Sequence, residues 1–265
     1  MIESAKHMRN FHNSIKSKMI SDTSLNINNQ IKLLDVGVGR GGDMMKWNNA
    51  NIKNVIGIDI NKSYIIEAIK RFKNQRSFFN NNYKFFYCYE NFIFQDYLKS
   101  KNINFVHEFD IISCMFAFHY FWKDEKTLEN ILQQISKSLK PNGFFIGTCP
   151  DGDKIFEYLQ NTDVFQNEAV MITKTYKNNK KTIGNSIDFM LSGTLYFGDN
   201  MISNEYLVFK DIFIEKCKKY DLNLIEYTNF ENLYTHNYNL NENYKIASFL
   251  NTKFVFKKSP IRSHE

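Results

Sequence analysis

Cysteine and proline are scarce in this 265-residue chain, with four and three residues, and no Cys-x-x-Cys pair occurs. The four cysteines, Cys88, Cys114, Cys149 and Cys217, are widely spaced, and three of them stand within apolar runs. This spacing indicates neither a zinc site nor a disulfide framework. We therefore expect no metal centre, and buried thiols in a reducing compartment.

Long apolar runs are also missing. The longest, residues 109–122, is interrupted by Asp110 and His119 and is shorter than the roughly 20 residues that a helix needs to cross a bilayer. No signal peptide is visible at the N-terminus. The sequence therefore predicts an intracellular protein without a membrane span.

A strong net charge is absent as well, because the chain has 34 Lys and Arg residues and 28 Asp and Glu residues, which gives a net charge of +6. This modest excess permits a phosphate-rich partner such as RNA without establishing one. With 43% hydrophobic residues, a chain of this length can bury one substantial core. We expect a single α/β domain over residues 1–265.

Apolar, strand-like runs alternate along the chain with stretches of helical period, which is typical of a parallel sheet with crossover helices. The predicted strands are residues 31–36, 54–59, 109–115, 144–149, 222–227 and 253–257, with 83–88 and 92–94 competing for strand three. The predicted helices are residues 42–47, 64–72, 128–139 and 210–220. The pattern predicts a doubly wound sheet.

Two stretches interrupt this alternation. Residues 140–143, Lys-Pro-Asn-Gly, predict a turn that ends one helix before the next strand begins. Residues 160–204 have weak periodicity and many polar residues, so they predict an insertion or lid.

A glycine-rich loop follows the first predicted strand. Its Gly37, Gly39 and Gly42 form a Gly-x-Gly-x-x-Gly string, which lets the backbone approach a ligand at a helix N-terminus. Folds that bind dinucleotides and folds that bind S-adenosylmethionine share this string. Asp35, two residues earlier, would face a pyrophosphate unfavourably but can pair with the ammonium of a methionine moiety. The acidic motif therefore favours S-adenosylmethionine over NAD.

Asp59 supports the same interpretation. It ends the second predicted strand, 22 residues beyond Gly37, where a carboxylate can accept hydrogen bonds from both ribose hydroxyls. The alternative is a tight glycine turn without a ligand, but that does not explain why loop and acid occur together in a strand–turn–helix context. We predict a cofactor with an adenosyl group.

Several blocks in register resemble the mRNA cap guanine-N7 methyltransferases of eukaryotes and large DNA viruses. The most specific blocks are Arg9-Asn10-Phe11, Gly41-Gly42-Asp43 with Lys46-Trp47, and Phe116 with His119-Tyr120. Further likeness lies at residues 145–150, 205–208 and 254–258, so it covers most of the chain. The resemblance implies a Rossmann-like class I methyltransferase fold with a mostly parallel seven-stranded sheet. Residues 1–30 would close over the cofactor and the cap.

The resemblance also implies roles for individual residues. S-adenosyl-L-methionine would be bound by Lys16, Asp35, Gly37, Gly39, Asp43, Asp59, Asp96, Met115 and Tyr120. The cap would be bound by His12, Asn13, Arg40, Lys46, Arg71, Phe116, His119, Tyr120, Pro150 and Glu205. These residue types suit the ligand: a carboxylate can accept from guanine N1–H and N2–H, rings can sandwich the base, and cations suit the triphosphate.

Three positions depart from the family pattern. Met115 stands where most members have Gln, His12 where they have Asn, and Asn251 where an ungapped match expects a cap-contacting Tyr. The last departure removes an aromatic face or a hydroxyl. Tyr244 or Tyr238 could replace it from a shifted segment.

Each of these residues, taken alone, also has an ordinary structural explanation. Met115 and Phe116 end an apolar strand and could be core, and His119 could be a satisfied or exposed histidine. Lys46 and Arg71 could belong to solvated helix faces, and Glu205 could support a helix start. Their joint register with one family favours the functional interpretation.

Guanine N7 carries an unprotonated lone pair, so methylation requires alignment rather than a general base, and we assign no catalytic residue. The alternatives are a methyltransferase of another acceptor and a non-catalytic RNA-binding or allosteric capping module. Expected partners are capped RNA and the triphosphatase and guanylyltransferase domains or subunits of a capping enzyme. The resemblance implies work in the nucleus or, for a viral protein, in the host cytoplasm, the virus factory or the virion.

Overall fold

The computed structural model describes residues 3–75, 81–88, 94–192 and 202–260. Its strands are β1 Lys32–Val36, β2 Asn54–Asp59, β3 Asn82–Tyr87, β4 Phe109–Met115, β5 Leu139–Pro150, β6 Val164–Gln166, β7 Val170–Lys174, β8 Ser186–Leu191, β9 Ser203–Tyr206, β10 Leu222–Asn229 and β11 Asn251–Lys258. The α-helices are α1 Glu3–Leu25, α2 Met44–Asn49, α3 Lys62–Gln75, α4 Phe94–Ser100, α5 Glu125–Ser138, α6 Gly152–Tyr158, α7 Lys210–Lys218 and α8 Glu242–Phe249. Short 3-10 helices are η2 Phe118–Lys123, η3 Phe230–Leu233 and η4 His236–Tyr238.

The main sheet has seven strands in the order β10-β11-β5-β4-β1-β2-β3. Strands β3, β2, β1, β4 and β5 pair in parallel, whereas β11 runs antiparallel to both of its neighbours. The predicted mostly parallel, seven-stranded sheet is therefore confirmed. Of the two segments predicted as alternatives for strand three, residues 83–88 correspond to β3, Asn82–Tyr87. In the other segment, residues 92–94, Phe94 begins α4, and residues 92 and 93 lie outside the described residues.

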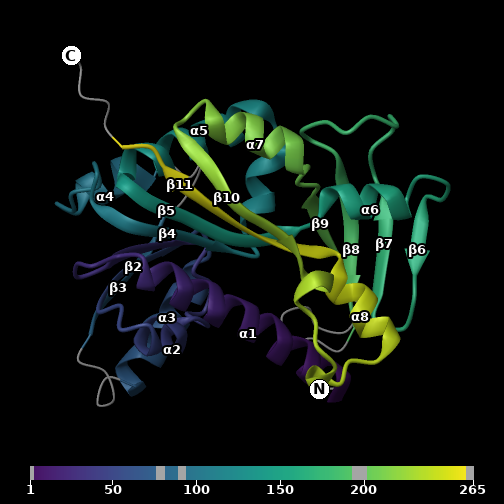
Figure 1. Ribbon diagram of the computed structural model, residues 1–265, viewed down its shortest axis with the longest axis horizontal. Helices are drawn as coiled ribbons and strands as arrows, with labels where there is room; N and C mark the ends of the chain where they lie inside the picture. The colour runs from purple at the N-terminus through teal and green to yellow at the C-terminus, as the bar shows by residue number, and fades with distance from the viewer. Residues whose placement is uncertain (1–2, 76–80, 89–93, 193–201, 261–265) are drawn as a thin grey trace.

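Helices cover both faces of this sheet (Figure 1). Alternate strand residues point to opposite faces: Leu33 belongs to the core cluster that includes residues of α2 and α3, whereas Leu34 belongs to the one that includes residues of α4, α5 and α7. Every residue of β4 is buried, as expected for a central strand covered on both faces. This double burial explains the near-continuous apolar runs in the sequence.

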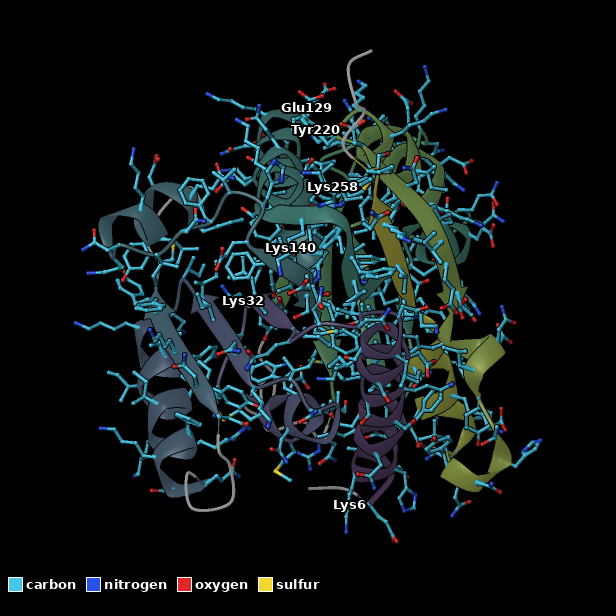
Figure 2. All side chains as sticks on the ribbon, turned by 60° about the vertical axis from the view of Figure 1, so that its left-hand side comes forward. Lys6, Lys32, Glu129, Lys140, Tyr220 and Lys258 are labelled. Carbon is cyan, nitrogen blue, oxygen red and sulfur yellow. The ribbon has the colours of Figure 1, made fainter. Side chains whose placement is uncertain are left out.

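The predicted turn at residues 140–143 is part of strand β5, which begins at Leu139. Asn142 takes a left-handed φ of 64°, and the pairing register with β4 shifts there. The Lys140 ammonium donates to both oxygens of Asp110 at 2.8 Å, and the Lys32 backbone N–H donates to the same carboxylate at 2.9 Å. Lys32 and Lys140 accordingly lie near each other (Figure 2). Asp110 thus links the beginnings of β1, β4 and β5. Because the register shifts at the predicted turn, its residues form a bulge within β5.

The expected insertion forms a second sheet, antiparallel, in the order β6-β7-β8-β9. Its strands are short, and buried residues such as Val170, Ile172 and Ile187 alternate with partly exposed ones. This sheet lies beyond the ends of β4 and β5, on the right in Figure 1. The carboxyl ends of β4 and β5 therefore lie next to the sheet β6-β7-β8-β9 (Figure 1).

The N-terminal segment is the long helix α1, whose stripe of buried residues includes Met8, Phe11, Ile15 and Met19. It packs against α2, α8 and β5, and so brings the start of the chain beside residues near its end (Figure 1). Among the described residues, no helix is both long and apolar enough to cross a membrane.

Candidate active site

The glycine loop forms a tight cradle between β1 and α2. The N–H groups of Gly37 and Val38 donate to the Ile58 carbonyl at 2.9 and 3.0 Å. Gly37 has a φ of +76°, and a Cβ on it would lie 2.5 Å from the Ala117 Cβ. A Cβ on Gly39 would meet nothing within 4 Å, so open space adjoins the loop there.

We expect Gly37→Ala to destabilise the protein by roughly 1–3 kcal/mol, because a non-glycine residue would be strained at this φ and its Cβ would collide with Ala117. Denaturant unfolding measures this loss. Gly42→Ala is the matched control, since a Cβ there meets nothing and no left-handed φ is required. Equal stability of the two variants would contradict a strained loop at Gly37.

Asp59 is fixed at the end of β2 by two backbone hydrogen bonds. The N–H groups of Gly39 and Asn61 donate to its Oδ2 and Oδ1, each at 2.8 Å. Burial raises the pKa of Asp59, against the effect of these bonds. Each oxygen keeps acceptor capacity for a further donor such as a hydroxyl.

Asp35 lies buried beside the same loop. The Ser113 hydroxyl donates to its Oδ1 at 2.6 Å. Burial and the nearby charge of Asp43 raise the pKa of Asp35 to about 8. A buried acid with so high a pKa would be stabilised in its ionised form by an incoming ammonium.

Asp43 joins two lysines from different helices. The ammonium groups of Lys16 from α1 and Lys46 from α2 lie 2.8 and 2.7 Å from the same oxygen, Oδ1. Burial alone would raise the pKa of Asp43, but the two cations lower it below its ordinary value. The Lys16 ammonium also lies 5.9 Å from the Phe116 ring centroid. Loop, lysines and aromatic ring therefore form one cluster.

Two further residues predicted for the cofactor lie at this edge of the sheet. Met115 ends β4 and is 9% exposed, so it also packs in the core, as its structural alternative holds. Asp96 lies in the exposed first turn of α4. Its contact with an adenine amine stays a prediction.

A second cluster joins η2 to the insertion. The His119 Nε2 lies 3.8 Å from the Glu205 Oε2, and both side chains are buried. Within the described part of the chain, neither ring nitrogen of His119 has a hydrogen-bond partner. Burial lowers the pKa of His119 to about 3 and raises that of Glu205 to about 7.

These observations exclude two of the ordinary explanations. His119 is neither exposed nor satisfied, and Glu205 lies in strand β9 rather than at a helix start. The half-exposed Tyr120 contacts His119, with 4.1 Å between ring centroids. A buried acceptor, a neutral imidazole with free nitrogens and an exposed ring therefore adjoin one another.

Aromatic side chains extend the first cluster toward α1 and α8. Phe116 has a left-handed φ of 55°, stabilised by hydrogen bonds from its N–H to the Thr148 carbonyl and hydroxyl. Its ring stacks on His12 with 5.5 Å between centroids, and His12 lies 3.0 Å from the Ser248 hydroxyl. Asn13 follows His12, half-buried on α1, and Pro150 is buried at the end of β5.

The cap-contacting Tyr expected at residue 251 has no counterpart there. The Asn251 amide donates to the carbonyls of Ala247 and Ser248 at 3.2 Å and so ends helix α8. Neither suggested substitute has a free hydroxyl: that of Tyr244 donates to the Ser192 carbonyl and that of Tyr238 to the Ser14 hydroxyl.

Arg40 lies on the outer side of the glycine loop. Its guanidinium lies 4.8 Å from the Tyr64 ring centroid, and its Nε lies 3.4 Å from a Glu67 carboxylate oxygen. Arg71 follows Glu67 by four residues on α3 and shares its face, so it extends the same surface. Among the described residues, no group of three or more His, Cys, Asp or Glu could hold a metal ion.

Sequence reasoning missed four residues that support these clusters. Ser113 orients Asp35, Tyr64 underlies Arg40, Ser248 contacts His12, and Phe230 packs edge-on against His12 and Phe116. Their contacts with the site depend on the fold, which brings these side chains together.

The mRNA (guanine-N(7))-methyltransferase domain matches residues 3–261. The mRNA cap guanine-N(7) methyltransferase of Caenorhabditis elegans is 36% identical over 180 residues, 64% of this chain and 46% of that protein. The mRNA cap guanine-N(7) methyltransferase 1 of rice is 30% identical over 237 residues, covering 88% of this chain and 63% of its own length. The chain thus spans roughly half the length of these relatives.

A probable mRNA-capping enzyme of Acanthamoeba polyphaga mimivirus is 31% identical over 263 residues, 87% of this chain and 22% of that protein. Among solved structures, an S-adenosylmethionine-dependent methyltransferase from Clostridium acetobutylicum aligns with a TM-score of 0.57 at 17% identity, over 91% of this chain and 92% of that one. The likeness to this solved structure confirms the class I methyltransferase fold. By sequence and by fold, the chain belongs to the mRNA (guanine-N(7))-methyltransferase domain family.

Proposed function

We propose that this chain transfers a methyl group from S-adenosylmethionine to N7 of the guanine in the GpppN cap of RNA. The observation that carries the proposal is the buried pair of His119 and Glu205, 3.8 Å apart, in which His119 follows by two residues the Ala117 that packs against Gly37. Guanine presents N1–H and N2–H donors and an O6 acceptor. A carboxylate and an imidazole with free nitrogens match these groups.

The glycine loop fits the cofactor. Open space adjoins Gly39, the Asp59 carboxylate can accept ribose hydroxyls, and the buried Asp35 suits an ammonium. Lys16 would face the methionine carboxylate. When bound, S-adenosylmethionine supplies an activated methyl group on a sulfonium.

The protein's part in the reaction is alignment. Tyr120, Phe116 and Pro150 would orient the guanine, and Arg40, Lys46 and Arg71 would hold the phosphates, so that N7 faces the methyl group. N7 has no proton to lose. The low pKa of His119, about 3, also makes it a poor base at neutral pH.

The direct test is transfer of labelled methyl to GpppRNA, with ApppRNA as the control. We expect label only in GpppRNA, at N7 of the cap. Label in neither RNA despite binding of S-adenosylhomocysteine would favour a methyltransferase of another acceptor or a non-catalytic module.

The likeness to part of a viral capping enzyme supports a further proposal, that triphosphatase and guanylyltransferase activities act beside this chain.

We expect Glu205→Gln to raise the KM for capped RNA by about tenfold or more while leaving the Kd for S-adenosylhomocysteine unchanged. The amide places a donor against the donors of guanine, and an unsatisfied buried donor costs about 1–3 kcal/mol. Glu215→Gln is the matched control, because the Glu215 side chain is exposed on the surface of α7. Equal losses of cofactor and cap binding in Glu205→Gln would instead assign Glu205 a structural role.

A further inference from the structure

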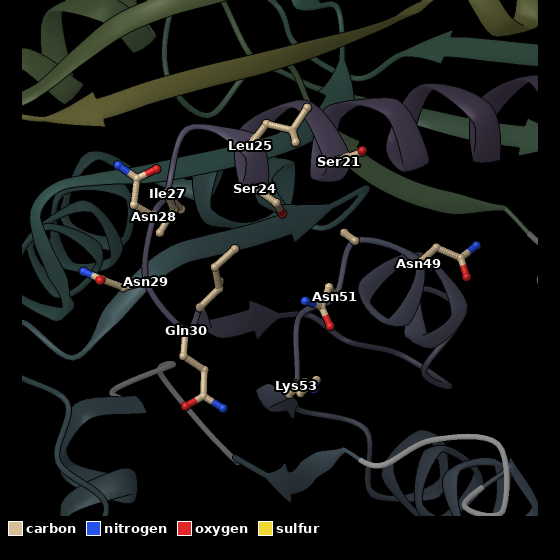
Figure 3. Close-up of a pocket in the computed structure, with 12 residues that line it drawn as sticks. Ser21, Ser24, Leu25, Ile27, Asn28, Asn29, Gln30, Asn49, Asn51 and Lys53 are labelled. Carbon is tan, nitrogen blue, oxygen red and sulfur yellow. The ribbon is translucent and has the colours of Figure 1, made fainter.

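An open hollow of about 670 Å³ lies at the edge of the sheet where β1 and β2 begin. It is lined by the end of α1, the chain that leads from α1 to β1, and the residues after α2 (Figure 3). Its volume is within the range of ligand sites, about 300–1,000 Å³. The reaction proposed above does not use it.

The lining has an unusual chemistry. No carboxylate is among the residues that line the hollow. Five exposed residues with side-chain amides line it: Asn28, Asn29, Gln30, Asn49 and Asn51. Within the described ranges none of these amides has a hydrogen-bond partner, whereas Asn61, Asn229 and Asn241 elsewhere cap helices or turns. Abundant asparagine alone does not explain why five unpaired amides gather at the rim of one hollow.

Two helices connect this hollow to the active site. Lys46 contacts Asp43 at the start of α2, and Asn49 ends that helix about 5 Å further along, at about 1.5 Å per residue. On α1, Ser21 and Ser24 follow Lys16 by about 8 and 12 Å. Stacked nucleotides rise about 3.4 Å each, so these distances correspond to about two to four nucleotides.

We infer that the hollow binds the first nucleotides that follow the cap, in single-stranded RNA. Amide side chains donate to and accept from base edges, which single-stranded RNA leaves accessible. No acidic side chain lines the hollow, and Lys53 at its rim has no ion-pair partner in the described part of the chain. This inference rests on the proposed function, because it extends the substrate from the cap to its leader.

The test compares KM for the GpppA dinucleotide with KM for capped RNAs of two, four and eight nucleotides, at saturating S-adenosylmethionine. We expect KM to fall about tenfold over the first four nucleotides and then to level off. In the double variant Asn49→Asp with Asn51→Asp, two carboxylates would repel the phosphates. KM for the eight-nucleotide RNA should then return to the dinucleotide value, with KM for GpppA unchanged.

Asp tolerates the left-handed φ of 56° at Asn51, so the variant should fold. The matched control is Asn178→Asp with Asn179→Asp, which adds the same charges to the exposed β7–β8 loop and should keep the length effect. A 4-thiouridine at the third nucleotide should crosslink within residues 21–31 or 49–53.

A length-independent wild-type KM, or a length effect that survives in the Asn49 and Asn51 variant, would overturn the inference alone. A crosslink confined to other residues would also overturn it, as expected if a protein partner occupies the hollow. Absence of methyl transfer to GpppA and to every capped RNA would overturn the proposed function as well.

Discussion

Replacing Asp59 by alanine is expected to weaken the binding of S-adenosylhomocysteine by roughly thirtyfold or more. The carboxylate is expected to accept two ribose hydroxyls, and each unpaired polar group in a buried site costs about 1–3 kcal/mol. The same change removes the acceptors of the Gly39 and Asn61 N–H groups, which loosens the glycine loop. Isothermal titration with S-adenosylhomocysteine measures the loss, and methyl transfer should fall with it.

Asp59→Asn serves as the control, because it keeps one carbonyl acceptor and the shape of the side chain. Its affinity should lie between those of the wild type and Asp59→Ala. Thermal unfolding of each variant separates loss of the site from loss of the fold. A folded Asp59→Ala protein with wild-type affinity would refute the ribose assignment.

The pH dependence of methyl transfer should reside in the KM for the cap and not in kcat. Burial raises the pKa of Glu205 to about 7 in the free protein, so below pH 7 its carboxyl is protonated and must lose a proton to accept from guanine. KM should therefore rise by up to tenfold per unit as pH falls below about 7, and be constant above it. Initial rates over a range of cap concentrations, at each pH from about 6 to 8 and at saturating S-adenosylmethionine, separate the two parameters.

Two variants make this prediction specific. Glu205→Gln should have a high KM that no longer changes with pH. His119→Asn should raise KM with the kcat profile unchanged in shape, because the neutral imidazole of the wild type has a pKa of about 3 and does not titrate in this range. A steep wild-type kcat profile that disappears in His119→Asn would make His119 an acid–base residue.

The parallel half of the fold was predictable because its strands are buried on both faces. The bounds predicted for β2 and β4 agree with the structure residue for residue, since continuous apolar runs mark both strands. The four strands of the insertion were not predicted. They are three to six residues long and partly exposed, so their pattern does not differ from that of a polar loop.

The candidate site divides in the same way. Asp35 and Asp59 were assigned from local context, since a strand, a glycine turn and a helix place both carboxylates at one edge. The contacts of His12 and His119 could not be derived from spacing, because their partners Ser248 and Glu205 lie far along the chain. Only the resemblance to a family selected these histidines.

The contact between His12 and Ser248 spans 236 positions of the chain. Closing so long a loop has an entropic cost that must be met before the contact contributes any stability. During synthesis, the glycine loop and the strands beside it can form early, whereas the cap pocket has to wait until α8 has left the ribosome. Nascent chains stalled after β5 should therefore acquire the cofactor cradle before any ability to distinguish one nucleobase from another.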